Sequence, residues 1–142
     1  MTPRKSRLLF ALAFAGVVFV TPVLAGSAVT VKVVGITSVQ GSMMIALYDE
    51  KGWSGAAIAR AKVAVSGNTI TAVLPALAPG RYGIKLYQDI NGNGEMDTNL
   101  VGFPTEPVGF SNDAPIRFGP PAFTDAGFDV GANGATQTIT VK

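Results

Sequence analysis

The sequence predicts an all-β protein, a seven-stranded antiparallel β-sandwich, from three observations. Short runs alternate apolar and polar residues with a period of two, which places successive side chains on opposite faces of a strand. Turn-forming pairs such as Gly67-Asn68 and Pro79-Gly80 separate these runs at spacings typical of a sandwich. No long stretch of the domain repeats with the period of a helix.

Each alternating run predicts one strand, and one stretch between the second and third runs departs from the pattern. In KGWSGAAIARA, Ser54 can cap a helix of one or two turns that carries Ala56 to Ala59, with Trp53 folded over the end of the sandwich. The predicted strands cover residues 28–36, 43–49, 60–66, 68–75, 81–89, 128–131 and 136–142.

The segment from residue 90 to 122 shows no periodicity and is unusually long for a loop inside a compact domain. It is rich in Pro and Gly, and it also carries Phe103, Phe110 and Phe118 at intervals of seven or eight residues. A segment that stays solvated has few aromatic residues. We therefore expect one long ordered loop, held by these rings against one end of the sandwich.

The first residues have the pattern of an export signal. Three basic residues precede an uncharged apolar run from Leu8 to Val20, which is shorter than the ~20 residues needed to cross a bilayer. This predicts a secretory signal peptide over residues 1–25, cleaved after Ala25, and a single periplasmic or secreted domain over residues 26–142 without stable membrane insertion. A retained N-terminal membrane anchor is the alternative.

Composition excludes several classes of function. Three of the 11 Lys and Arg residues lie in the signal segment, so eight remain against 9 acidic residues, a net charge of −1, and no basic patch suited to nucleic acid is present. The chain has no His and no Cys, which excludes Ser–His triads, thiol nucleophiles and zinc sites made of nitrogen and sulfur ligands. We predict that it is not an enzyme, because a carboxylate mechanism is the main catalytic route left.

One loop has the spacing of a cation site. In DINGNGEMDTN, Asp89, Asn91 and Asn93 occupy positions 1, 3 and 5 of the pattern D-x-[DN]-x-[DN]-G, and Gly94 occupies position 6. In a calcium loop the first three supply side-chain oxygens, and the glycine allows a sharp turn around the ion. The first half of the loop therefore predicts calcium.

The second half of the pattern is incomplete. Glu95 can supply a backbone carbonyl and Asp97 can coordinate the ion directly or through water. An EF-hand requires a bidentate Glu at position 12, where this chain has Leu100, so the helix–loop–helix site is excluded. Another carboxylate, Glu106 or Asp113, would have to complete the coordination.

The alternative for this loop is an ion-free, solvated turn, because Asn-Gly pairs are common turn dipeptides. Turn chemistry does not explain why Asp89, Glu95 and Asp97 gather within nine residues, since like charges repel without a cation between them. We favour a calcium ion that acts as a structural clamp.

The chain carries five separated motifs, which are PGRY at 79–82, the loop at 89–99, GFPTE at 102–106, GFSN at 109–112 and GPPAF at 119–123. Together these motifs resemble a bacterial family of small exported proteins, domain-of-unknown-function family 2141. The resemblance implies a compartment and a fold rather than an activity. The stretch LPALAPGRYGIKLYQD is also similar to transthyretin-like modules, which implies a prealbumin-like or immunoglobulin-like sandwich; the histidine-dependent hydroxyisourate hydrolase activity of that fold cannot apply here.

We therefore expect an exported, calcium-stabilised binding or structural module of the cell envelope, whose partner is a protein or an envelope polysaccharide. A non-catalytic carbohydrate-binding domain is one alternative, with Trp53 and Phe110 as stacking platforms. Tyr82 and Tyr87 are less suitable, because they fall on opposite faces of one strand. The other alternative is a glycoside hydrolase, which would need two carboxylates held ~5–9.5 Å apart. Its candidate acid and base are Glu106 and Asp97.

Overall fold

The computed structural model describes residues 26–142, and the predicted signal peptide lies outside the described residues. This part of the chain is all-β, as predicted, with eight strands and two short helical turns. The strands are β1 (Ser27–Val34), β2 (Ser42–Asp49), β3 (Ala59–Ala64), β4 (Ile70–Leu77), β5 (Gly80–Asp89), β6 (Val108–Phe110), β7 (Phe128–Val130) and β8 (Ala135–Thr140), and the helical turns are η1 (Ser111–Asp113) and α1 (Phe123–Ala126).

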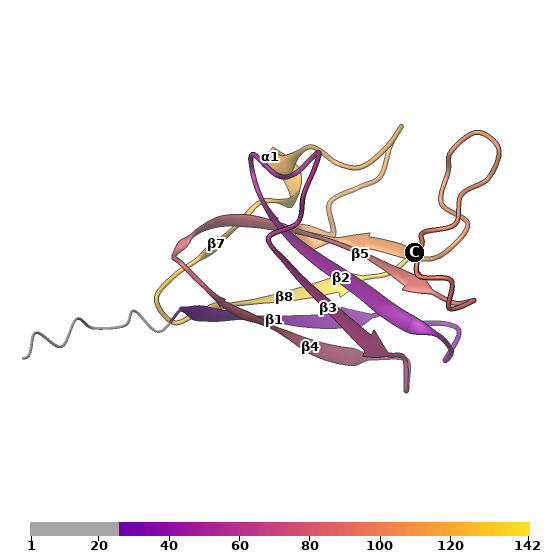
Figure 1. Cartoon of the computed structure of the whole chain (residues 1–142), viewed down its shortest axis with the longest axis horizontal. Helices are drawn as coiled ribbons and strands as arrows, with labels where there is room; N and C mark the ends of the chain where they lie inside the picture. Colours follow the sequence, from indigo (N-terminus) through magenta and orange to yellow (C-terminus); the bar gives the residue numbers. More distant parts are fainter. Residues whose placement is uncertain (1–25) are drawn as a thin grey trace, which may run out of the picture.

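The strands form two sheets (Figure 1). One has the order β4-β1-β8, and the other has the order β3-β2-β5-β6, with β7 also paired to β5. Because β6 pairs with Lys85–Tyr87 and β7 with Gly80–Tyr82, these two short strands follow one another along a single edge of β5. The predicted antiparallel arrangement is wrong at one pair, since β1 and β8 run parallel. Parallel neighbours need a long crossover, and the chain between these two strands supplies it.

One core lies between the sheets. Val29, Val31 and Val33 of β1 are fully buried, as the period of two requires, and they pack with the inward residues of the opposite sheet, including Ile45 and Ile84. Burial of each such side chain contributes ~1.5–3 kcal/mol relative to exposure. The inward face thus explains why these runs alternate.

All seven predicted strands form, and the eighth, β6, lies inside the segment expected to be one loop. Two of the three expected aromatic anchors of that segment are wrong, because Phe103 is 48% exposed and Phe118 is 101% exposed. Only Phe110, at the end of β6, is buried. Pairing of β6 with β5 therefore holds this part of the segment, and it is the sheet edge that orders it.

The predicted helix after Ser54 does not form, and the stretch is a series of turns. Asp49 accepts a hydrogen bond from the Gly52 amide at 2.7 Å, and the Gly55 amide donates to the Gly52 carbonyl at 2.8 Å. Glycine is a poor helix residue, and these local bonds prevail over the helix preference of the few alanines. The turn carries Trp53 onto the outer face of the five-stranded sheet.

On that outer face a second apolar cluster forms, which we call the aromatic lid. Trp53 donates its indole N–H to the Pro121 carbonyl at 2.9 Å and packs edge-to-face against Phe123. Gly83 of β5 lies beneath the ring, where a Cβ would approach Trp53 to 2.7 Å. The lid comprises Trp53, Val108, Phe110, Ala114, Phe123 and Ala126.

The loop predicted to bind calcium projects at the right of Figure 1, and α1, which belongs to the lid, lies above the sheets to the left of this loop. Within residues 26–142, no helix is long and apolar enough to span a membrane.

Candidate functional site

Asp89 organises the loop that follows β5. It is the last residue of the strand and is fully buried. Its Oδ1 accepts hydrogen bonds from the amides of Gly92 (2.8 Å) and Asn93 (3.2 Å), and its Oδ2 accepts one from Gly94 (2.9 Å). Both glycines have positive φ, 75° and 79°, a conformation that turns their amides inward and that other residues rarely adopt. The buried carboxylate of Asp89 therefore accepts the hydrogen bonds that close the first turn of the loop.

Three further polar side chains of the loop, those of Asn91, Asn93 and Asp97, bond to one another. The side-chain amides of Asn91 and Asn93 donate to the two carboxylate oxygens of Asp97, at 2.5 and 2.8 Å. The Oδ1 atoms of the same two residues accept bonds from the backbone amides of Asn93 and Glu95, two positions ahead, which makes two consecutive Asx turns. The predicted ligands at positions 1, 3, 5 and 9 thus belong to one compact loop.

Glu106 accepts hydrogen bonds from two separate parts of this loop. It is 8% exposed, and its Oε1 accepts the Ile90 amide (2.9 Å) while its Oε2 accepts the Asp97 amide (3.1 Å). One carboxylate thereby joins the start, the middle and the end of the segment. We call residues 89–106 the polar loop. Asp113, the other carboxylate considered for this role, lies elsewhere, because it accepts bonds from the Thr140 amide and hydroxyl.

The atoms of the polar loop that could coordinate an ion are oxygens, the ligands that hard cations such as calcium prefer. Among residues 26–142, no three His, Cys, Asp or Glu side chains are grouped closely enough to hold a metal ion by themselves. Calcium binding would therefore rely on the amide oxygens of Asn91 and Asn93 and on backbone carbonyls. The two side-chain amides would turn so that their oxygens, instead of their N–H groups, point to an ion bound at Asp97.

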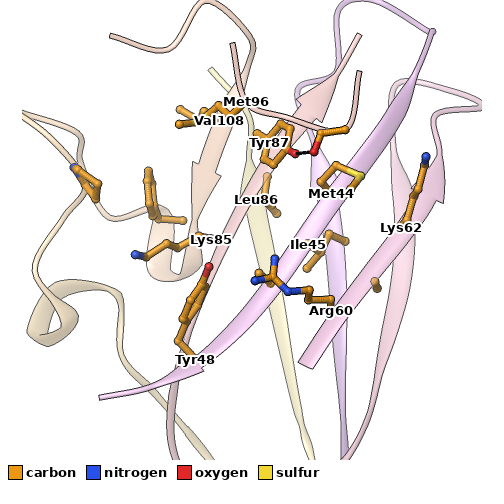
Figure 2. Close-up of a pocket in the computed structure, with 15 residues that line it drawn as sticks. Met44, Ile45, Tyr48, Arg60, Lys62, Lys85, Leu86, Tyr87, Met96 and Val108 are labelled. Carbon is orange, nitrogen blue, oxygen red and sulfur yellow. Dashed lines mark hydrogen bonds between the residues drawn. The ribbon is translucent and has the colours of Figure 1, made fainter. Parts of the chain in front are cut away.

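A cleft of about 610 Å³ lies between the polar loop and the aromatic lid, over the outer face of the five-stranded sheet (Figure 2). Strand register places its floor in two rows. Arg60, Ala46 and Lys85 lie opposite one another on β3, β2 and β5, and Phe110 of β6 continues their row. The second row consists of Lys62, Met44, Tyr87 and Val108.

Lys85 is the half-buried cation of the cleft. Its Nζ donates to the Trp53 carbonyl and lies 4.8 Å from the centre of the Tyr48 ring and 4.4 Å from that of Trp53. Burial lowers the pKa of Lys85 from its ordinary value, because the ammonium loses water. No carboxylate of the described residues lines this cleft.

Tyr87 connects the cleft to the polar loop. Its hydroxyl donates to the Gly94 carbonyl at 3.0 Å, while its ring packs against the lid cluster. Burial raises the pKa of Tyr87, and the nearby negative charges of Asp89 and Glu106 raise it further. The hydroxyl therefore remains a neutral donor at physiological pH, and a change in the loop will reach the cleft through this bond.

Comparison with known proteins places the chain in a family. A family model described as "Uncharacterized protein conserved in bacteria (DUF2141)" matches residues 31–139. The chain belongs to DUF2141. The family resemblance of the five motifs is thereby confirmed, and the matched residues include the polar loop and the cleft. No curated protein and no solved structure matches the chain.

In this DUF2141 protein the structure brings together Asp89, Asn91, Asn93, Asp97 and Glu106 of the predicted site, while the Glu95 side chain is exposed to solvent. Sequence reasoning missed the cleft itself. Its only local signal is the alternation that turns Arg60 and Lys62 outward on β3, and the partners across the sheet follow from register, which a sequence does not display.

The aromatic residues considered for sugar stacking are mostly covered. Trp53 is 7% exposed and Phe110 is 9% exposed, so neither ring offers an open face for stacking, although Phe110 is among the residues that line the cleft. Tyr82 packs against the core between the sheets and Tyr87 against the lid, which confirms that they face opposite sides of β5.

Proposed function

We propose that the protein is an exported binding module of the bacterial cell envelope, in which calcium clamps the polar loop. One observation carries this proposal. The loop in which Asp89, Asn91, Asn93 and Asp97 converge also forms one wall of the cleft, through Gly94 and Met96. An ion held there stabilises the wall of a binding site for a protein, a polysaccharide or a smaller ligand.

Electrostatics supports a cation in the loop. Asp89, Asp97 and Glu106 lie within one hydrogen-bonded segment, and the donors to them in residues 26–142 are neutral backbone and side-chain N–H groups. Neutral donors stabilise each carboxylate but leave the three negative charges uncompensated. A divalent cation would reduce that repulsion and replace the two bonds from asparagine to Asp97.

Thermal unfolding of the purified protein, stripped of metal with a chelator, tests the clamp. Exported calcium sites often have dissociation constants of ~0.1–1 mM. With a constant near ~0.1 mM, about 10 mM calcium adds about 2.7 kcal/mol, which raises the Tm by roughly 10 °C for a domain of this size. Magnesium should have a much smaller effect, because it gives up its water ligands reluctantly.

Two matched variants locate the ion. Asp97→Asn keeps the shape of the side chain but removes its charge, and we expect it to abolish most of the calcium shift. Glu95→Gln is the control, because its expected contribution is a backbone carbonyl, so the shift should persist. A wild-type Tm that does not respond to calcium, or an equal response in Asp97→Asn, would exclude the clamp.

The enzymatic alternative has less support. Both oxygens of Glu106 already accept backbone amides, and the residue is 8% exposed, so it is poorly placed as a general acid. In the described part of the chain no carboxylate lines the cleft. A binding function agrees better with a cleft whose polar groups are mainly cations.

Export is the second component of the proposal, and it is supported by the basic and apolar pattern of residues 1–25. Expression of the full chain in a bacterial host, followed by cell fractionation and mass determination, tests it. We expect a periplasmic or secreted product that begins at Gly26. An uncleaved chain in the cytoplasm would exclude export, and an uncleaved chain in the membrane would favour the anchor.

We also propose that the two sheets form a prealbumin-like or immunoglobulin-like sandwich. The Tyr82 hydroxyl donates to the Ala78 carbonyl at 2.7 Å, just after the chain crosses from β4 in one sheet to β5 in the other. A tyrosine that bonds back to the preceding backbone at such a crossing is typical of these sandwiches. An experimental structure compared with both fold groups would test the assignment.

A further inference from the structure

The strongest unexplained feature is the charge pattern of the cleft. Arg60 and Lys85 lie in one row of the sheet, each directly opposite Ala46 from its own side. Neighbouring strands are ~4.8 Å apart, so these two positions are separated by ~10 Å. Ala46 carries only a methyl group and lines the cleft, so the floor between these two positions is formed by a small side chain.

The two cations differ in their environment. Arg60 is exposed, whereas Lys85 is half-buried and held in place by the Trp53 carbonyl and by the faces of two aromatic rings. An ammonium that is already oriented and partly desolvated loses less entropy and less hydration when it meets an anion. The lowered pKa of Lys85 reflects the same desolvation.

Apart from Lys62, an exposed residue of the edge strand β3, the rest of the cleft is lined mainly by apolar side chains and by Tyr87. Figure 2 shows Met44, Tyr87, Met96 and Val108 grouped towards the polar loop, while Lys85 and Arg60 flank Tyr48 at the other end. The cleft is therefore amphipathic along its length. Its volume of about 610 Å³ is within the ~300–1,000 Å³ usual for small-molecule sites, which combine apolar walls with a few fixed polar groups.

We propose that this cleft binds a small amphiphilic anion of the fatty-acid type, with its carboxylate over Ala46 between Lys85 and Arg60 and its apolar chain against Met44 and Met96. The inference rests on the binding role proposed above, but it does not require calcium. A cationic amphiphile would be repelled by the basic residues. A sugar would find few hydrogen-bond acceptors, because the described lining holds no Asp, Glu, Asn or Gln.

Titration calorimetry with the purified full domain and three probes of equal chain length tests the class of ligand. The probes are decanoate, 1-decanol and decyltrimethylammonium, each below its aggregation concentration. We expect decanoate to bind at least about tenfold more tightly than the other two, and 0.5 M salt to reduce this preference. Equal affinity for all three, or tighter binding of the cation, would overturn the proposal.

Substitutions then locate the head group. Lys85→Met keeps most of the apolar stem and removes the charge, and we expect the preference for decanoate over decanol to fall by about tenfold. Arg60→Gln, at an exposed position where folding is not at risk, should reduce it less. Lys32→Met is the matched control, since Lys32 is exposed on β1 of the other sheet. If both cleft variants keep the full preference, the carboxylate does not bind between these residues.

The same titration in chelator and in calcium separates this inference from the clamp. If decanoate fails to bind while calcium still raises the Tm, the ligand class is wrong and the clamp stands. If decanoate binds but calcium has no effect, the clamp is wrong and the cleft stands. Binding that is tighter in calcium would show that the polar loop controls the wall of the cleft.

Discussion

The polar loop and the aromatic lid lie at the two ends of the cleft and become ordered by different physics. In the polar loop, two buried carboxylates accept five backbone amides, and amide side chains bond to a third carboxylate. In the lid, Trp53 contacts rings from β6 and α1, and apolar burial dominates. The first is sensitive to ions and charge, and the second to shape and volume.

The hydrogen bonds of η1, which lies next to the lid, also differ from those of the polar loop. The Ser111 hydroxyl donates to the Ala126 carbonyl (2.5 Å) and accepts the Ile84 amide (2.8 Å), while the Asn112 side chain donates to the carbonyls of Asp125 and Gly127. These are neutral contacts that join distant segments. The lid should therefore be insensitive to calcium, and this contrast leads to the predictions below.

The largest effect is expected at the centre of the lid. Trp53→Ala removes a ring that packs against Phe110 and Phe123, and loss of a buried aromatic side chain costs ~3–5 kcal/mol of unfolding free energy. Urea unfolding measures this loss, followed by circular dichroism because the variant lacks the Trp fluorescence signal. The control is Phe118→Ala, because Phe118 is fully exposed and should change stability by less than ~0.5 kcal/mol.

This variant also tests the separation of the two ends. The calcium shift of the Tm should persist in Trp53→Ala, because the hydrogen bonds to the loop's carboxylates come from the loop itself and not from the lid. A cost below about 1 kcal/mol would contradict a lid held by burial. Loss of the calcium response would contradict the contrast between the two ends.

A smaller but still clear effect is expected at Asp89. Asp89→Ala leaves three inward-turned amides without their acceptor, at a cost of about 3 kcal/mol, since each hydrogen bond to a charged group contributes ~1.5–3 kcal/mol and water will satisfy part of the loss. Hydrogen exchange at Gly92 and Gly94 should accelerate, while exchange in the lid stays the same. Asp129→Ala, an exposed carboxylate on β7, is the control. Unchanged exchange at both glycines would show that Asp89 does not order the loop.

The sequence predicts the candidate site best where contacts are local. The spacing of Asp89, Asn91, Asn93 and Asp97 predicted which side chains would gather, because an Asx turn or a calcium loop is closed by residues only a few positions apart. Glu106 was also placed near them. Whether they hold calcium stays a prediction.

The sequence predicts much less where contacts are long-range. The Trp53 indole reaches Pro121, 68 residues away, and Phe123, not Phe103 or Phe118, packs on it. No periodicity distinguishes these phenylalanines, because each is a single ring in an irregular segment. The cleft was missed for the same reason, since its two rows exist only once the register of four strands is set.

The smallest expected effect is a pH dependence of stability that arises at Lys85, which contacts the lid, and at Tyr87, which bonds to the polar loop. Burial lowers the pKa of Lys85 below 10.5, so between the two pKa values the unfolded chain binds more protons and stability rises with pH. The pKa of Tyr87 is raised above 10, so its contribution is complete below pH 10 and is lost as the pH rises through the folded value.

Urea midpoints measured from pH 8 to 11 should therefore increase and then decrease. Lys85→Met should remove the rise and Tyr87→Phe should weaken the decline, whereas calcium should lower the pKa of Tyr87 alone, because the negative charges that raise it belong to the polar loop.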